Sequence, residues 1–253
     1  MCDITYVRQC FATFREGDPL KCALILHTKK FDVNSRDKYG KSPLMTTVYN
    51  ASYETMKLLL DNGAWVDLED GDGNTAMHRA ILLEDIKSVE ILSRYTYDKY
   101  HTNDSGYTVA DTVATTCNVE ILCQLVNAGL DMDVINPISG YTPLEYAIFN
   151  GNADFAKVML RLGLAVKQGR RNLVFQAILM SDLELAEMLL ERGSDVHAED
   201  DIIFTTIWLK RNVHLDEDLL YLLAKYVKRT SPFHVTEPTI SQPILLHPGG
   251  EVT

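Results

Sequence analysis

The chain has 253 residues, and 46% of them are hydrophobic, which is enough to bury a substantial core. Its 24 Lys and Arg residues are outnumbered by 35 Asp and Glu residues, so the formal net charge is −11. This balance argues against a dedicated nucleic-acid or anionic-membrane binder, because both need a surplus of basic side chains. We therefore expect neither nucleic acid nor a membrane as a partner.

Five cysteines are scattered along the chain without a CxxC pair. This odd number fits neither a disulfide framework nor a zinc site, and we predict reduced thiols. The first residues, MCDITYVRQCFATFREG, include charges where a signal peptide needs an apolar run. No stretch approaches the roughly 18 apolar residues of a membrane span. We expect a cytoplasmic protein, with a nuclear location as the alternative.

The chain repeats itself with a period of about 33 residues, which two sets of segments reveal. GKSPLMTTV, GNTAMHRAI, GYTVADTVA and GYTPLEYAI each begin at a glycine, at Gly40, Gly73, Gly106 and Gly140. These glycines lie 33, 33 and 34 residues apart. A second set, LLLDNGAWVD, QLVNAGLDMD, MLRLGLAV and MLLERGSDV, runs beside the first. Two interlocked sets at one spacing indicate repeated structural units.

The unit at 37–69 predicts two helices joined by turns. Ser42 can cap the first helix, and Pro43 fits its first position, where the missing N–H group costs nothing. Apolar residues recur at helical spacing through this helix and through a second one over 53–62. Gly63 then ends the second helix with a left-handed backbone conformation. Since each unit is too small to bury its own apolar stripe, neighbouring units must stack into a solenoid.

These patterns resemble the ankyrin repeat family. SPLMTTV, TAMHRAI and TPLEYAI are similar to its TPLHxA core, and LLLDNGAWVD and MLLERGSDV are similar to its LLxxGADVN core. The resemblance implies an all-α solenoid of about seven helix-turn-helix units, with short β-hairpin-like turns, or fingers, between them. We place the solenoid at 1–230, with units at 1–36, 37–69, 70–102, 103–136, 137–166, 167–199 and 200–229. The residues 231–253 hold four prolines and no regular period, which predicts a flexible tail.

Unit 103–136 departs from the family pattern at three positions. Val109 stands in place of Pro, Asp111 in place of His, and Cys117 in place of a usual Gly. We therefore expect this unit to pack less regularly than its neighbours.

His78, in the segment GNTAMHRA, is the first candidate for chemistry. Catalysis would need a nucleophile, a base and an orienting group that converge on one pocket, and nothing else in the chain points there. The resemblance implies instead that a histidine at this position hydrogen-bonds across the turn and braces neighbouring fingers. The segment DGDGN fails the calcium-loop pattern, and no Walker loop, HExxH or GxSxG occurs. We predict no enzyme, no metal site, no cofactor and no small-molecule substrate.

The resemblance implies that a protein partner binds a concave face built from finger tips and the exposed ends of the first helices. Tyrosines recur at the tips, and Tyr provides a large contact area at little entropic cost. Apolar residues stand at helix ends, where they either mark an interface or turn inward to the core. The candidate partner-binding residues are Tyr39, Lys41, Asp72, Asn74, Leu82, Tyr107, Tyr141, Phe149, Leu179 and Met180. We take Tyr107, Tyr141 and Phe149 as the anchors.

A basic patch of Lys167, Arg170 and Arg171 lies where one finger is about three residues short. It can receive an acidic segment of a partner or simply form a solvated turn. The function that we expect is a non-enzymatic intracellular protein-interaction module with a regulatory or adaptor role. Two alternatives stay open. One is a viral host-range or signalling inhibitor, because the resemblance extends to poxvirus ankyrin proteins, and the other is a ubiquitin-ligase substrate adaptor that acts through the C-terminal segment.

Overall fold

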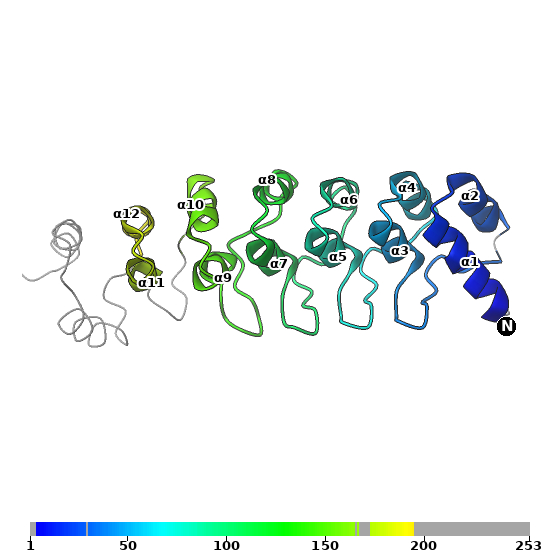
Figure 1. Cartoon of the computed structure of the whole chain (residues 1–253), viewed down its shortest axis with the longest axis horizontal. Coiled ribbons are helices and arrows are strands. Elements are labelled where there is room, and N and C mark those ends of the chain that lie inside the picture. The colour runs from blue at the N-terminus through cyan, green and yellow to red at the C-terminus, as the bar shows by residue number, and fades with distance from the viewer. Residues whose placement is uncertain (1–3, 29, 165, 167–172, 195–253) are drawn as a thin grey trace, which may run out of the picture.

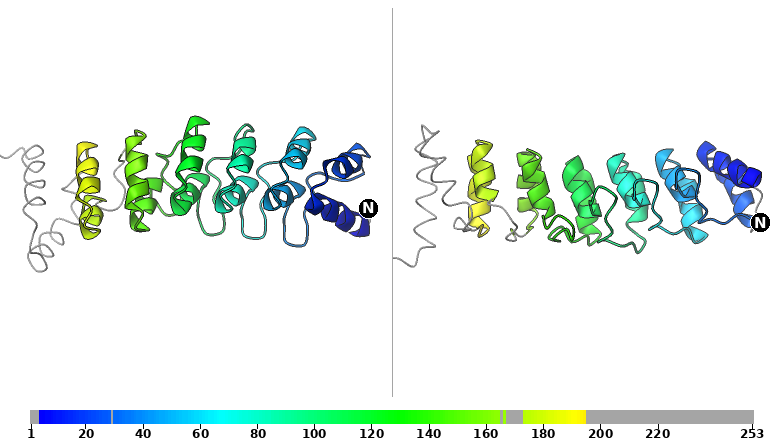
Figure 2. Two further views of the ribbon diagram at one scale, coloured as in Figure 1. Left: turned by 45° about the horizontal axis from the view of Figure 1, so that its top comes forward. Right: turned by 90° about the horizontal axis from the view of Figure 1, so that it is seen from below.

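The computed structural model describes residues 4–28, 30–164, 166 and 173–194. They form helices and turns, without a strand. The helices pair into units that stack in a single row (Figure 1), and Figure 2 shows the same row from two further directions. The predicted all-α solenoid of stacked helix pairs is confirmed.

The pairs form two layers, with the fingers beside the inner one (Figure 1). The inner helices are α1 (Ile4–Glu16), α3 (Pro43–Tyr49), α5 (Ala76–Leu82), α7 (Val109–Thr116), α9 (Pro143–Phe149) and α11 (Leu173–Leu179). The outer helices are α2 (Pro19–His27), α4 (Tyr53–Asp61), α6 (Ile86–Leu92), α8 (Val119–Asn127), α10 (Ala153–Arg161) and α12 (Leu183–Glu191). None of these helices has both the length and the apolar content needed to span a bilayer.

A hydroxyl side chain starts each of the four inner helices α3, α5, α7 and α9. The caps are Ser42, Thr75, Thr108 and Thr142, and each accepts a hydrogen bond from the backbone N–H three residues further on. This bond satisfies one of the amide groups that a helix start leaves unpaired. The predicted roles of Ser42 and Pro43 are confirmed, since Pro43 is the first residue of α3.

The turn between the inner and outer helix of a unit requires a left-handed backbone. Ala51, Glu84, Cys117 and Ser181 adopt positive φ angles of 51° to 57° there, and Gly151 does so at 79°. Cys117 therefore shares a conformation with residues of other units.

In unit 103–136, Asp111 supplies the second half of a capping box with Thr108. The expectation that 103–136 packs less regularly was wrong, because Val109 and the other inward residues of α7 are buried like their equivalents.

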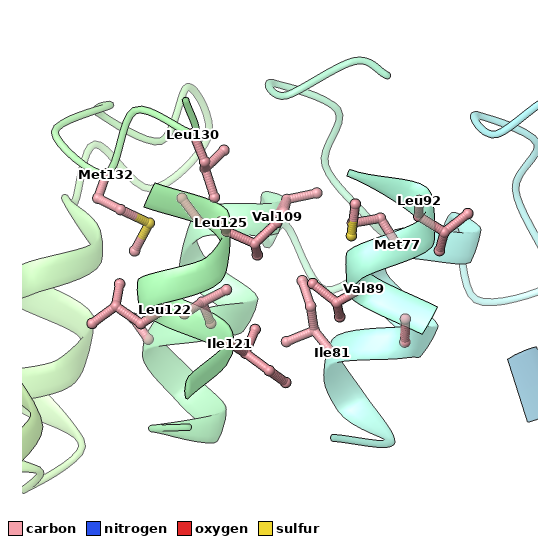
Figure 3. Close-up of a cluster of buried hydrophobic side chains, with 14 of the residues drawn as sticks. Met77, Ile81, Val89, Leu92, Val109, Ile121, Leu122, Leu125, Leu130 and Met132 are labelled. Atoms are coloured by element: carbon pink, nitrogen blue, oxygen red, sulfur yellow. The ribbon is translucent and has the colours of Figure 1, made fainter. Parts of the chain in front are cut away.

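The core runs along the whole row between the two helix layers. Figure 3 shows part of this core, in which Ile81 and Val89 of one unit lie toward Val109 and Ile121 of the next, while Leu122 lies on the side of the unit after that. Fully burying one such side chain stabilises the fold by about 1.5–3 kcal/mol. Each unit thus completes the core of its neighbour, as the solenoid prediction requires.

One helix pair falls within each predicted unit from 1–36 to 167–199, although the boundaries themselves stay a prediction. Three predictions lie outside the described residues: the unit at 200–229, the tail at 231–253, and the basic patch of Lys167, Arg170 and Arg171.

Candidate functional site

Four fingers project beside the inner helices, at 37–41, 70–74, 103–107 and 136–141, and we number them 1 to 4. A backbone hydrogen bond of 2.8–3.0 Å from the first residue to the last closes each hairpin. The side chain of that first residue, an Asp or Asn, also accepts two backbone N–H groups from within its own finger. A glycine with positive φ completes the turn in each case. The same local chemistry therefore builds all four fingers.

Hydrogen bonds also join each finger to the next. The Gly71 amide donates to the Tyr39 carbonyl at 3.0 Å, and the Asp104 amide donates to the Asp72 carbonyl at 3.1 Å. The Asn136 side chain donates to the Gly106 carbonyl at 2.7 Å. The fingers are thus a connected row, and we call the surface of finger tips and inner helices the finger face.

Asn74 corrects the prediction that its side chain meets a partner. Only 4% of it is exposed. Its Oδ1 accepts a hydrogen bond of 2.9 Å from the Asn103 side chain of the next finger. The side chain therefore joins fingers 2 and 3, and the exposed residues at that tip are Gly71 and Asp72.

His78 is fully buried at the start of α5, and it braces two fingers. Its Nδ1 lies 2.8 Å from the Thr75 hydroxyl, and its Nε2 lies 3.2 Å from the Tyr107 carbonyl of finger 3. Burial, and then the neighbouring His101 ring, lower the pKa of His78 to about 4. Both ring nitrogens are engaged and the neutral ring is the favoured form, which suits a structural brace.

Four aromatic rings gather on fingers 3 and 4 and on α9. Tyr146 is the centre: its ring centroid lies 5.3 Å from that of Tyr107 and 5.8 Å from that of Tyr141, both edge-to-face. Phe149 lies 5.6 Å from Tyr141. All four are half-buried, and we call them the aromatic cluster. The structure brings the three predicted anchors together.

Sequence reasoning missed Tyr146, the residue that joins them. The sequence places Tyr146 three residues before Phe149, and in a helix this spacing puts both side chains on one side. That spacing could have identified Tyr146 as a member of the cluster.

The remaining apolar candidates stand at helix ends. Leu82 and Leu179 are 46% and 41% exposed, and Met180 is half-buried against the core. Leu82 and Tyr107 line one shallow depression together with acidic tip residues. Leu179 ends α11, the inner helix that packs beside α9.

Finger 1 carries cations beside tyrosine rings. The Lys38 ammonium lies 4.6 Å from the ring centroid of Tyr39, which is 58% exposed. The Lys41 ammonium lies 3.8 Å from the centroid of Tyr49, at the end of α3. Such cation–π contacts hold a side-chain cation over a ring without neutralising it.

Arg79, which the sequence did not single out, stands between fingers 1 and 2 and is paired. Its Nε lies 2.6 Å from Asp70, and its Nη2 also contacts Asp72. Burial acts against the charged form of Asp70, but hydrogen bonds from Arg79 and two backbone amides outweigh it. The pKa of Asp70 therefore lies below its usual range.

The comparisons with known proteins agree with this architecture. The sequence model of the family described as ankyrin repeats (3 copies) matches residues 10–103 and 112–200, so the chain belongs to the ankyrin repeat family. The ankyrin repeat domain of Bcl-3 superposes with a TM-score of 0.68 at 21% identity, covering 74% of this chain and 86% of that one. The ankyrin repeat protein EF0377 superposes with a TM-score of 0.65 at 21% identity, covering 74% and 98%. At this identity the likeness concerns the fold alone.

Several sequence relatives are larger proteins. An ankyrin repeat protein of variola virus is 29% identical over 206 residues, which are 76% of this chain and 34% of the relative. The human transient receptor potential cation channel subfamily A member 1 is 25% identical over 176 residues, covering 65% and 16%. A zebrafish putative palmitoyltransferase, ZDHHC13, is 27% identical over 190 residues, covering 73% and 29%. The chain spans about a third or less of the length of these relatives.

Proposed function

We propose that this protein is an interaction module that binds a partner protein on its finger face, with the aromatic cluster as the anchor. The cluster carries the proposal. Its rings are half-buried, so they are held in place by their neighbours and still present an apolar surface to solvent. Large aromatic side chains in fixed positions are the residues that contribute most to binding hot spots.

The rigidity of the finger row supports the same proposal. Backbone and side-chain hydrogen bonds join successive fingers, so the surface is ordered before a partner arrives. A preformed surface avoids the entropic cost of ordering loops on binding. An ankyrin repeat domain is generally a protein–protein interaction module, and repeat solenoids use extended surfaces of this kind.

The proposed module acts without chemistry of its own, in a regulatory or adaptor role. His78, the residue that drew attention as a candidate for catalysis, is buried and engaged at both ring nitrogens. The similarity to ankyrin repeat proteins of variola and fowlpox viruses favours a second candidate, a viral inhibitor of host signalling. That candidate would use the same finger face. The ubiquitin-ligase adaptor alternative depends on the C-terminal segment, which lies outside the described residues.

The test replaces Tyr107, Tyr141 and Phe149 with alanine together. Affinity purification with quantitative mass spectrometry then compares the proteins retained by the wild type and by the triple variant. The matched control replaces three exposed apolar residues away from the finger face, Trp65, Val119 and Leu162, with alanine. We expect specific proteins to be retained by the wild type and by the control but lost from the aromatic variant.

Thermal melting of all three proteins separates binding from folding. Loss of retained proteins counts for the proposal only where the aromatic variant still melts cooperatively above the assay temperature. Retention that is unchanged in a folded aromatic variant would refute the role of the cluster.

A further inference from the structure

The N-terminal end of the finger face carries a group of basic side chains that the net charge of −11 does not lead one to expect. Arg8 and Arg15 on α1 and Arg36, Lys38 and Lys41 in or beside finger 1 line two adjoining surface depressions. The charged residues that share this lining are Asp37, Asp70, Asp72 and Arg79. The larger depression has a volume of about 620 Å³. Tyr39 borders both of them, and we call this region the basic pocket.

The cations of the basic pocket are not neutralised. Among the residues that the structure describes, no carboxylate forms an ion pair with any of the five. Asp37 lies in the same finger, but its Oδ1 accepts the amides of Tyr39 and Lys41 at 2.8 and 2.9 Å. These bonds leave its negative charge in place, but the lining holds six cations, the five and Arg79, against the three carboxylates of Asp37, Asp70 and Asp72. Positive charge is therefore in excess by three.

Arg79 provides the contrast within the same surface. Its guanidinium lies over the Tyr49 ring and is held by two carboxylates, whereas the ammonium groups of Lys38 and Lys41 lie over tyrosine rings without a carboxylate partner among the described residues. A ring attracts a cation but leaves its donors able to bind an incoming anion. The pocket thus holds oriented cations with unused hydrogen-bond donors.

The charge of the finger face changes sign between finger 1 and finger 2. Finger 1 presents Lys38 and Lys41, whereas fingers 2 and 3 present Asp72 and Asp104 as exposed residues. Long polyanions such as nucleic acids would meet these acidic tips next to the pocket, in a chain of negative net charge. A short anionic stretch avoids that repulsion and complements the pocket.

We propose that the basic pocket binds an acidic segment of the partner protein, through its Asp and Glu carboxylates. The proposal rests on the proposed function, for which it specifies the chemistry of the partner. It also differs from the basic patch predicted at 167–171, because these cations come from α1 and finger 1.

The test uses the full chain and a fluorescein-labelled oligoglutamate peptide, with oligoglutamine of equal length as the uncharged control. Binding is measured by fluorescence anisotropy at low ionic strength and again at about 1 M salt, where the Debye length falls to about 3 Å. We expect oligoglutamate to bind, salt to weaken the binding strongly, and oligoglutamine not to bind.

Two double variants locate the site. Lys38→Glu with Lys41→Glu should raise the Kd for oligoglutamate at least about tenfold, since it replaces attraction by repulsion in the pocket. Lys57→Glu with Lys87→Glu makes the same change in net charge on the outer helices and should change the Kd by no more than about twofold. The milder pair Lys38→Gln with Lys41→Gln removes the two charges without reversing them, so it should give an intermediate loss of affinity for oligoglutamate. It replaces the charge-reversed variant if that variant does not fold.

Several outcomes would overturn the inference. One is that oligoglutamate does not bind at low ionic strength, and another is that both charge-reversed variants lose the same affinity for it. The third is that a single-stranded oligonucleotide binds as tightly as oligoglutamate and that Lys38→Glu with Lys41→Glu abolishes this binding too. The aromatic triple-alanine variant should still bind oligoglutamate. Retention of partner proteins by the aromatic cluster is measured in a separate experiment. A failure of the oligoglutamate test would therefore not refute the proposed function.

Discussion

Acidification should loosen the brace that His78 forms between fingers 2 and 3. The neutral ring bonds to the Thr75 hydroxyl and to the Tyr107 carbonyl, and burial lowers the pKa of His78 from its usual 6.5 to about 4. The unfolded chain therefore takes up a proton at a higher pH than the folded chain does. The stability that the neutral ring contributes is fully present above pH 6.5 and is lost as the pH falls toward 4.

The size of this loss follows from the two pKa values. Each unit of separation corresponds to about 1.4 kcal/mol, so the full difference is about 3 kcal/mol. Linkage gives a loss of about 2 kcal/mol at pH 5, and nearly none at pH 7.5. Such a change is large for a domain whose total stability is about 5–15 kcal/mol.

The assay is urea unfolding followed by circular dichroism, from pH 7.5 down to pH 4.5, for the wild type and for His78→Gln. At pH 7.5 the variant should be less stable by about 1–3 kcal/mol, because a buried hydrogen-bonding partner is lost. The difference should shrink by about 2 kcal/mol at pH 5, because glutamine has no proton to gain. His27→Gln, at an exposed position at the end of α2, is the control and should follow the wild type.

Parallel pH profiles for the wild type and His78→Gln would refute this reasoning. They would mean that His78 is already protonated in the folded chain or that its burial is not maintained.

Three further substitutions test the fold. Asn136→Ala should lower the free energy of unfolding in urea by about 2–3 kcal/mol, because it removes a buried hydrogen-bond donor to the Asp111 carboxylate. A loss below about 0.5 kcal/mol would contradict that hydrogen bond. Gly73→Ala should destabilise the fold more than Gly63→Ala. Both glycines have positive φ, but only a Cβ atom at position 73 would lie within 3 Å of the next finger. Equal melting temperatures of the two variants would contradict this. Lys157→Met should lower stability by about 1 kcal/mol at low salt and by less at about 1 M salt, because it removes the ion pairs from α10 to Asp182 and Glu184 at the start of α12, as well as one to Asp154 within α10. A loss independent of salt would contradict the electrostatic origin.

Local chemistry explains why the sequence predicts so much of this fold. A capping hydroxyl such as Ser42, a following Pro43 and a glycine such as Gly63 determine the backbone within a few residues of themselves. The repeat period then multiplies that local pattern along the chain. The role of His78 is predictable for the same reason, since the family resemblance implies a brace at that position of the repeat and the structure shows one.

Exposure and charge at the finger face depend on neighbours that the pattern does not reveal. Asn74 looks like a tip residue in sequence, yet a side chain 29 residues away buries it. Tyr146 becomes the centre of the aromatic cluster only because Tyr107 of finger 3 and Tyr141 of finger 4 both contact its ring.

The basic pocket is the strongest case of this kind. Arg8 and Arg15 stand on α1, and they meet Lys38 only when the first unit stacks on the second. The sequence by itself determined the period, the helix starts and the turns, because each depends on contacts within one unit. Which side chains face solvent, and which charges meet unpaired, was decided only by the tertiary structure, because those contacts join one unit to the next.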